Sequence, residues 1–472
     1  MIRVIDRPNI RLKDIEFQLV QDTNNSILSD FSKDIGRLPY VELGTSTIES
    51  NLILSLSLYN DQFLPRVNMK FKDSTGKLID PLFPIDNTIL KVFIQSDNDD
   101  LMPIRMDFKI TQFHPTKSKS GDNNDIVFEL DGILDVDNLY TSFFESYDDT
   151  SYNVLRKIAS NIKLGFASNI DSTNDKMVWI NPSIQYMEFI QHVVKFSFKS
   201  QETFLFAYID FYYNLNYVDV EAILSEDIKE QQAFVGNKFT LDDVVDNNKE
   251  ITDLVLLNHP DKISSNFYIS SYDILNRSTA TNLEIGYMYY GSYYDTEGNT
   301  IYDLALDSIT TTGSDGNGII MKGNIGEITE MTKFSSDSIY NGKIDTDNVH
   351  KYFLYAYKNN DRNLQFLQKV KMKINITTAN FNLYRFQKVL VKLYKINDIL
   401  NEENNSSYTE ASQNQADVIQ DENKLNERLS GEWLITSINY TYSSSNTFNQ
   451  EIILVKRELS FNKNDFDINT KN

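Results

Sequence analysis

Residues 151–220 constrain the fold of this chain more than any other stretch, because two helical patterns and a long aromatic run follow one another there. Thr150 and Ser151 can cap the start of the first helix, and Gly165 can end it. Its apolar residues recur at helical spacing, at Val154, Leu155, Ile158 and Ile162. The spacing therefore predicts an amphipathic helix at the start of this stretch.

A second helix is predicted after Trp179, with Pro182 and Ser183 as its cap region. Residues 204–218 then change to a strand-forming run rich in Phe and Tyr. The apolar positions of the second helix are Ile184, Met187, Ile190 and Val194. Two helices packed on aromatic strands make a small α/β domain, which we place at residues 146–226.

The rest of the chain is typical of β-structure. Over residues 1–145, apolar and polar residues alternate in short runs separated by turn-forming residues. The alternating apolar positions are Leu52, Leu54, Leu56 and Leu58; Val67, Met69 and Phe71; Leu90, Val92 and Ile94; Met106, Phe108 and Ile110; and Ile126, Phe128 and Leu130. This pattern predicts a first β-barrel or sandwich.

Residues 346–472 predict a second β-domain, because Val370, Met372, Ile374 and Ile376 alternate and a hairpin follows Gly431. Trp433 in this hairpin fits packing within the domain and a subunit boundary about equally well. Within the domain, residues 401–428 are polar and acidic and predict a solvated loop.

Residues 227–345 give mixed signals and are predicted to be a loop-rich β insertion or linker. Strong turn sequences stand at residues 295–299 and 313–318, and residues 287–294 read as a strand. The predicted fold class is therefore mainly β with a small α/β part, in which an α/β domain separates two β-domains.

The run SYNVLRKIASNIKLGF, which contains Leu155, Ile158 and Gly165, resembles the "vL..IA..lGl" helix of phage baseplate hub proteins. The segment from Trp179 to the aromatic strand is similar to the Trp, second helix and strand that follow in that family. The family covers the central hub of contractile-tailed phages and the amino-terminal part of type VI secretion spike proteins.

The closing hairpin also resembles the family, whose last hairpin reads "G.w.V..i.h…y.q.l.l.r". Where the family often has His before the turn, this chain has Tyr440 or Tyr442. The matching residues are Gly431, Trp433, Ile435, Ile438, Gln450, Ile452, Leu454 and Arg457. The resemblance spans most of the chain, but it is weaker over residues 1–145 and weakest over residues 227–345.

The resemblance implies two similar tube-type β-barrels in one chain and a homotrimer that supplies six of them. Such a ring would join the tail tube or tube-initiator proteins to a central spike protein, with baseplate wedge proteins as further neighbours. Tape-measure protein and DNA would pass through its channel without specific binding. The chain would then belong to the virion tail baseplate, assembled in the host cytoplasm. Residues 1–145 and 370–460 show no sequence self-similarity that indicates the duplication independently.

The charge balance is consistent with such a channel. Asp and Glu number 67 against 45 Lys and Arg, a net charge of −22, which disfavours binding to nucleic acid through phosphate neutralisation. Carboxylates on a channel wall would repel phosphate, which lets DNA slide. The chain has no Cys, hence no disulfide or thiolate metal site, and no apolar stretch long enough for a membrane span.

The sequence shows no catalytic or cofactor motif, and we predict neither an enzyme nor a cofactor or metal site. The four histidines, His114, His192, His259 and His350, lack metal-site spacing and fit structural or surface roles. We expect His192 to be solvated. The acidic runs at residues 97–100 and 171–175 fit solvated turns better than Ca²⁺ loops.

The predicted function is therefore a structural subunit of the baseplate hub. One alternative is a tail-associated carbohydrate-active enzyme or receptor-binding protein, motivated by 12% aromatic residues and many carboxylates. A second alternative keeps the hub fold and places it in a contractile injection or secretion particle.

Overall fold

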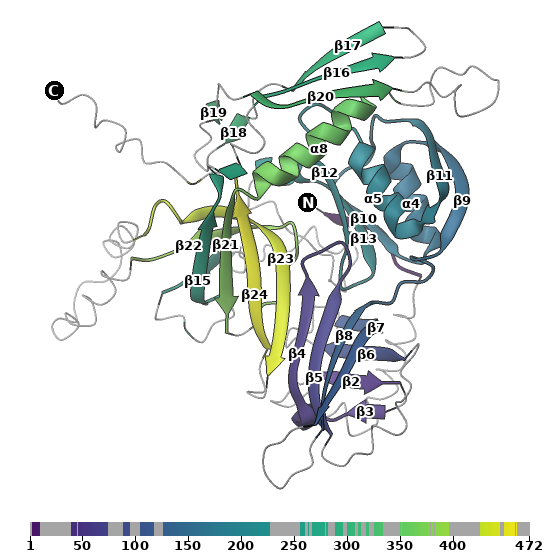
Figure 1. Cartoon of the computed structure of the whole chain (residues 1–472). Coiled ribbons are helices and arrows are strands. Elements are labelled where there is room, and N and C mark those ends of the chain that lie inside the picture. The colour runs from purple at the N-terminus through teal and green to yellow at the C-terminus, as the bar shows by residue number, and fades with distance from the viewer. Residues whose placement is uncertain are drawn as a thin grey trace, which may run out of the picture.

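The computed structural model confirms a mainly β fold with a small α/β part (Figure 1). It describes residues 2–9, 39–73 apart from 45, 88–94, 104–117, 126–226, 255–259, 263, 267–281 apart from 279, 288–295, 300–306, 310–312, 318–320, 325–333, 350–395 apart from 351, 378 and 382, 425–443, 448–457 and 459. The expected turns at 97–100, 296–299 and 313–317 and most of the acidic loop at 401–428 lie outside these residues.

The α/β part contains both expected helices. One sheet has the strand order β1-β10-β13-β12, and β9 and β11 form a separate two-stranded sheet. The elements are β1 (Arg3–Asp6), β9 (Ser142–Asp149), α4 (Ser151–Asn161), β10 (Gly165–Ser168), β11 (Met177–Gln185), α5 (Tyr186–Phe196), β12 (Leu205–Ile209), β13 (Asn214–Asp219) and α6 (Val220–Ser225). The aromatic run forms β12 and β13, and its rings are part of the core, as with Tyr208 and Tyr217.

The first helix starts as predicted but ends differently. The Thr150 side chain caps α4 by accepting a hydrogen bond from the backbone N–H of Asn153. The expectation that Gly165 ends the helix is wrong, because the helix stops at Asn161 and Lys163 takes the left-handed conformation with φ 62°. Gly165 instead begins β10.

The second helix begins later than predicted. Pro182 and Ser183 lie in β11, where Pro182 pairs with Phe144 of β9, so they do not cap the helix. The N-cap of α5 is Gln185, which makes no side-chain capping hydrogen bond. The apolar spacing had merged the end of an edge strand with the helix that follows, so Ile184 belongs to the strand.

The first β-half of the chain forms one continuous antiparallel ladder in the order β4-β5-β8-β7-β6-β2-β3. Its core residues include most of the alternating apolar positions found in the sequence. The strands are β2 (Tyr40–Leu43), β3 (Ser46–Ile48), β4 (Ile53–Asn60), β5 (Arg66–Asp73), β6 (Ile89–Ile94), β7 (Ile104–Lys117) and β8 (Ile126–Leu134), with a 3₁₀ turn η1 (Ser50–Leu52) before β4.

One residue departs from the predicted alternation. Leu54 is 41% exposed, whereas Leu56 and Leu58 are fully buried. The pairing of β4 with β5 shifts register between Ile53 and Ser55, and a bulge of this kind moves the alternating pattern onto the opposite face. The buried set of β4 therefore begins at Ile53 and resumes at Leu56.

The second β-half comes from residues that are further apart in the sequence. Its ladder runs β15-β21-β24-β23-β22-β14, and the Leu257 N–H donates to the Phe267 carbonyl at 3.1 Å, which brings its two ends together. The strands are β14 (Val255–Leu257), β15 (Ile269–Asn276), β21 (Val370–Ile376), β22 (Lys388–Lys392), β23 (Gly431–Ser443) and β24 (Phe448–Lys456). Two of them, β14 and β15, come from the stretch predicted to be an insertion.

The remaining elements lie beside this half in Figure 1. Helix α8 (Phe353–Leu367) packs against α5, where the rings of Phe353 and Phe196 stack at 3.9 Å. Two small sheets complete the described residues, with orders β17-β16-β20 and β18-β19. Their strands are β16 (Met288–Asp295), β17 (Thr300–Leu306), β18 (Thr310–Thr312), β19 (Gly318–Ile320) and β20 (Ile325–Lys333).

The two β-halves repeat one topology. In each, five strands follow the chain in order and lie in space as first, second, fifth, fourth and third. These are β4-β5-β8-β7-β6 in the first half and β15-β21-β24-β23-β22 in the second. The register shifts also repeat, between Ile53 and Ser55 in one first strand and between Ile269 and Ser271 in the other.

The same correspondence holds across the remaining ladders. The fourth strand shifts between Ile110 and Gln112 in one half and between Ile435 and Ser437 in the other. These shifts and pairings match residue by residue only when Val67 corresponds to Met372, Gly132 to Leu454, Thr111 to Thr436 and Phe108 to Trp433. The two halves are therefore an internal duplication, which the sequence alone did not reveal.

The two halves join edge to edge in a single sheet. The second part of β23 pairs with β4, from Ile438 opposite Asn60 to Ser443 opposite Ser55. The first part of β23 pairs with β22 instead. Figure 1 shows the result as a curved sheet that runs from β15 through β23 and β4 to β7.

Gly165→Ala should destabilise the protein, because the added Cβ would lie 2.2 Å from Asn214 Oδ1 and 2.8 Å from the Asp6 carbonyl oxygen. The Asn214 side chain cannot yield easily, since its amide donates to the buried Asp210. We expect a loss of about 1–3 kcal/mol in the free energy of unfolding. Urea denaturation followed by circular dichroism measures it. Ser160→Ala on the exposed side of α4 is the control, and equal midpoints for both variants would contradict the prediction.

Candidate functional site

The three parts of the chain meet at Arg385, which lies just before β22 and is 5% exposed. Its Nε donates to the Thr436 carbonyl of β23 at 2.6 Å. Its terminal nitrogens reach the turn between β4 and β5, donating to the carbonyls of Gln62 and Asp61. The planar guanidinium therefore ties the two β-halves together where their shared ladder begins.

The same guanidinium also contacts the α/β part. Its carbon lies 4.7 Å from the ring centroid of Tyr208 on β12, whose hydroxyl donates to the Arg385 carbonyl at 2.9 Å. Burial lowers the pKa of Arg385 to about 10, which still leaves it charged at neutral pH. Among the described residues, its hydrogen bonds go to carbonyl oxygens and the Asn60 side chain, which together with the aromatic faces compensate the buried charge.

A second buried group, Asp175, anchors the start of α4. Its carboxylate accepts hydrogen bonds from the Ser151 hydroxyl at 2.5 Å, the Thr173 hydroxyl at 2.6 Å and the Phe198 N–H at 2.8 Å. The prediction that residues 171–175 form a wholly solvated turn is therefore wrong for Asp175, which is fully buried, although Asp171 is exposed. These donors occupy the carboxylate, so its arrangement serves folding rather than cation binding.

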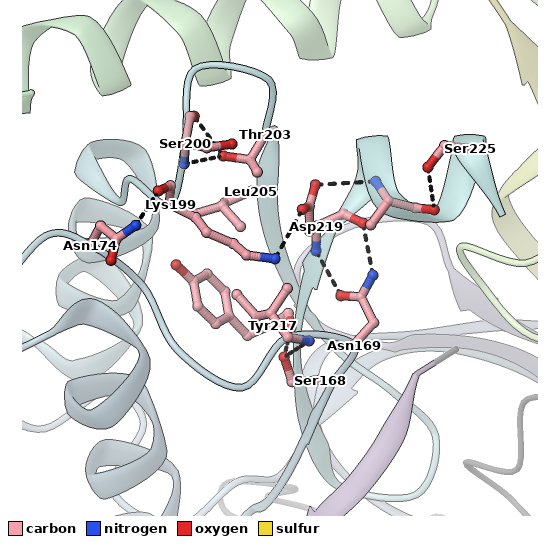
Figure 2. Close-up of polar contacts among 12 residues, drawn as sticks. Ser168, Asn169, Asn174, Lys199, Ser200, Thr203, Leu205, Tyr217, Asp219 and Ser225 are labelled. Atoms are coloured by element: carbon pink, nitrogen blue, oxygen red, sulfur yellow. Dashed lines mark hydrogen bonds and ion pairs between the residues drawn. The ribbon is translucent and has the colours of Figure 1, made fainter.

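Asp219 holds the end of β13, the start of α6 and a neighbouring loop together (Figure 2). Its side chain accepts from the Ala222 N–H at 3.3 Å and lies 3.7 Å from Lys199 Nζ. Its backbone exchanges two hydrogen bonds with the Asn169 side-chain amide, at 2.8 and 2.9 Å. Burial raises the pKa of the Asp219 carboxyl above its ordinary value, against the smaller opposing effects of Ala222 and Lys199.

Each residue taken from the sequence motifs of the α/β part lies in the core. Leu155 and Ile158 are fully buried on α4. The Trp179 indole N–H donates to the Asp149 carbonyl at 2.9 Å, which ties β11 to the end of β9 just before α4. Gly165 is buried at the start of β10, where a Cβ would meet the Asn214 side chain and the Asp6 carbonyl oxygen. These residues fill and align the domain and do not form a single reactive site.

The hairpin residues also have structural positions. Trp433 is buried within its own β-half and its indole N–H donates to the Leu429 carbonyl at 2.9 Å, which favours packing within the domain. Gln450 is buried and makes two hydrogen bonds to the backbone of Asn380, at 2.8 and 3.1 Å. Gly431 has φ 116°, a conformation that other residues rarely adopt.

One face of the shared sheet is polar and continuous across the joint between β23 and β4. Lys70 pairs with Glu129 at 3.0 Å in the first half, and Lys373 pairs with Glu451 at 2.6 Å in the second. The hydrogen bond from Lys70 holds the pKa of Glu129 below its usual range. Glu129 and Glu451 occupy equivalent positions of the duplication. This face therefore carries one such ion pair in each half.

The histidines do not form a metal site. His114 and His192 are exposed, as expected for His192, while His259 is half-buried. His350 is buried and its Nε2 donates to the Phe196 carbonyl at 2.9 Å, with a pKa lowered by burial. Within the described ranges no three His, Asp or Glu side chains gather as a metal would require, and no helix is long and apolar enough to cross a membrane.

Sequence reasoning missed Arg385 and the role of Asp175. Arg385 stands in no motif. The carbonyl oxygens to which its guanidinium donates belong to residues more than 50 positions away in the sequence. The only local signal at Asp175 was its position in an acidic, Thr-containing loop after a helix with a Ser at its start. Neither interaction follows from spacing alone.

No protein-family model matches this chain, and no curated protein matches it by sequence. Its structural neighbours are phage tail proteins and type VI secretion proteins. A tail protein from Neisseria meningitidis MC58 is 10% identical, with 89% of this chain and 96% of that chain covered and a TM-score of 0.48. The 43 kDa tail protein of prophage MuSo2 from Shewanella oneidensis is 9% identical, with 89% and 97% covered and a TM-score of 0.45.

The E. coli c3393 protein, a type VI secretion component described as similar to T4 bacteriophage tail proteins, is 7% identical. The alignment covers 89% of this chain and 79% of that chain, with a TM-score of 0.40.

Arg385→Met should weaken the junction, because the carbonyls of Gln62 and Thr436 would lose their donor. We expect about 1–3 kcal/mol lost for each buried carbonyl left without a partner, measured by urea denaturation. Arg385→Lys keeps the charge but not the planar fork, so it should fall between the wild type and Arg385→Met. The control is Arg66→Met, whose partly exposed pair with Asp61 should cost less than about 1 kcal/mol. Equal losses at both arginines would contradict this role.

Asp219→Asn should change how stability depends on pH. The folded-state pKa of Asp219 is raised above the ordinary value of 3.8. The contribution of its protonated form to the free energy of unfolding is therefore fully present below pH 3.8 and is lost as pH rises through the folded-state pKa. Asn still accepts from the Ala222 N–H but cannot ionise. Relative to wild type, the variant should therefore become more stable as pH rises from about 4 to about 7, in a series of urea midpoints. Asp171→Asn, at an exposed position, is the control, and parallel pH profiles for Asp219→Asn and wild type would refute the assignment.

Proposed function

We propose that this chain is a structural subunit of a phage tail baseplate hub, in which three copies form a ring around a channel. The observation that carries the proposal is the internal duplication, joined edge to edge through β23 and β4. Three copies of a duplicated chain present six similar β-units around one axis. Such a ring matches a six-fold tail tube on one side and a three-fold spike on the other.

Several features support a mechanical role. The residues that match the hub family are buried or shape the backbone, and the polar clusters at Arg385, Asp175 and Asp219 connect elements of the fold. Within the described residues, none of these clusters combines a nucleophile, a base and an open site. In this proposal, the protein acts through its shape and its interfaces, as a virion tail component and not as an enzyme.

The proposed channel wall is the polar face of the shared sheet. On this face, Lys70 pairs with Glu129 and Lys373 pairs with Glu451, so two of its carboxylates have a cation beside them. Paired charges offer passing phosphate neither a basic track nor a strong repulsive field. DNA and tape-measure protein would thus slide past without specific binding, while the tube, spike and wedge proteins bind elsewhere on the ring.

The solution mass tests the proposal. Multi-angle light scattering should give three times the 54.6 kDa mass of the chain, and negative-stain images should show three-fold rings with a central hole. The physical reason is that pairing between neighbouring copies would cover strand edges that a single copy leaves exposed. A monomer at every concentration tested would reject the trimer.

The alternatives predict different results. A carbohydrate-active enzyme would hydrolyse host polysaccharide or peptidoglycan as the isolated chain, and a receptor-binding protein would bind host glycans. The hub of a contractile injection or secretion particle would form the same ring, and the morphology of the particle that contains it would separate it from a phage tail.

A further inference from the structure

We infer that the outer edge of β15 in one copy pairs with the second part of β7 in the next copy, in the register that β4 and β23 use within the chain. The inference deepens the proposed ring and rests on that proposal for the number of copies. Its basis is the duplication, because β15 is equivalent to β4 and β7 is equivalent to β23.

The joint inside the chain shows what such an edge looks like when it is covered. Along it, Leu56 and Leu58 of β4 are fully buried, and Asn439 and Tyr440 of β23 are 6% and 2% exposed. The hydroxyl oxygens of Ser57 and Thr441 lie 3.3 Å apart across the pair. This joint lies between the first strand of one repeat and the fourth strand of the other.

No described strand covers the equivalent edges of β15 and β7. On β15, Tyr272 and Ile274 are only half-buried and Leu275 is 53% exposed, although Leu56, Leu58 and Tyr59 are their equivalents. On β7, His114 and Pro115 are exposed where Asn439 and Tyr440 are buried.

The strand pairing shows the same openness. Strand β6 pairs with β7 only as far as Lys109, as β22 pairs with β23 only as far as Leu434. Among the described strands, β21 alone pairs with β15, and the part of β7 beyond Lys109 pairs with β8 alone. The part of β23 that corresponds to this open edge is the part that β4 covers.

Transferring the register gives specific antiparallel pairs between copies. The pair of Asn60 with Ile438 in the joint corresponds to Asn276 with Phe113 between copies. The pairs that follow are Leu275 with His114, Ile274 with Pro115, Asp273 with Thr116 and Tyr272 with Lys117. The Thr116 hydroxyl would donate to the Asp273 carboxylate, where Thr441 meets Ser57 in the chain.

Pro115 makes the joint between copies weaker than the joint within the chain. Proline has no backbone N–H, so the ladder has one donor fewer than at Tyr440. A proline on a strand edge also discourages unregulated pairing. The expected interface therefore forms by closing a ring of copies and does not compete with the stronger joint during folding of one chain.

The partner is a second copy of this chain, because only the chain's own edges carry the repeated register. The contact is head to tail, with β15 of each copy meeting β7 of its neighbour. Head-to-tail contacts close into rings or extend into filaments, according to the angle between neighbouring copies.

Engineered disulfides test the register, since the chain has no Cys of its own. Thr116→Cys with Asp273→Cys should give covalent dimers and trimers on oxidation, seen on non-reducing gels. Ser57→Cys with Thr441→Cys is the positive control and should close within one chain. Gln112→Cys with Asp273→Cys is the offset control, because Gln112 lies about 13 Å along the strand from Thr116.

Light scattering on the same samples separates this inference from the proposed function. A trimer in which the positive control closes and the 116–273 pair does not would overturn the edge pairing and leave the ring intact. Crosslinked chains longer than three copies would support the edge pairing and reject the trimer. A monomer without crosslinks between copies would reject both. Mixing the two single-cysteine variants should yield dimers only, and crosslinked dimers from Thr116→Cys alone would contradict the head-to-tail arrangement.

Discussion

The pairing of β23 with β4 is the interaction on which the rest of this structure depends. It turns two β-halves, separated by the α/β part, into one sheet. A strand edge is a liability when it is exposed, and this chain covers one edge of each half with the other. The joint also sets the angle between the halves, and hence the curvature that a ring of copies would repeat.

Buried polar groups hold the α/β part against this sheet. Arg385 connects β23, the turn after β4 and Tyr208 through carbonyl oxygens and aromatic faces. Asp175 and Asp219 connect elements within the α/β part itself, at the start of α4 and at the end of β13. A buried charge is costly to leave unpaired, so each cluster specifies one arrangement of the parts. Rigid parts in one arrangement are what the proposed ring requires.

Duplication explains both the symmetry and the weak points of the proposed assembly. The same ladder, with the same register shifts, occurs twice in the chain, but only one pair of its edges is covered within it. The two repeats differ at the uncovered edge of β7, where Pro115 stands at the position that Tyr440 has on β23. A chain built this way favours its internal joint and leaves the external one for assembly.

Local pattern was sufficient for most strands of the first β-half and for the two predicted helices, because alternation and helical spacing depend only on neighbours along the chain. It gave no sign of α8, which lies where residues 346–472 were predicted to be a β-domain. It misplaced the end of α4 and the start of α5, where Lys163 and Gln185 decide the boundary and no strong cap signals it. Arg385, the burial of Asp175 and the correspondence of Val67 with Met372 depend on residues far apart in the sequence. Only the folded chain brings these residues together, since hydrogen-bond register in a sheet is a property of pairs of strands and leaves little trace in either strand alone.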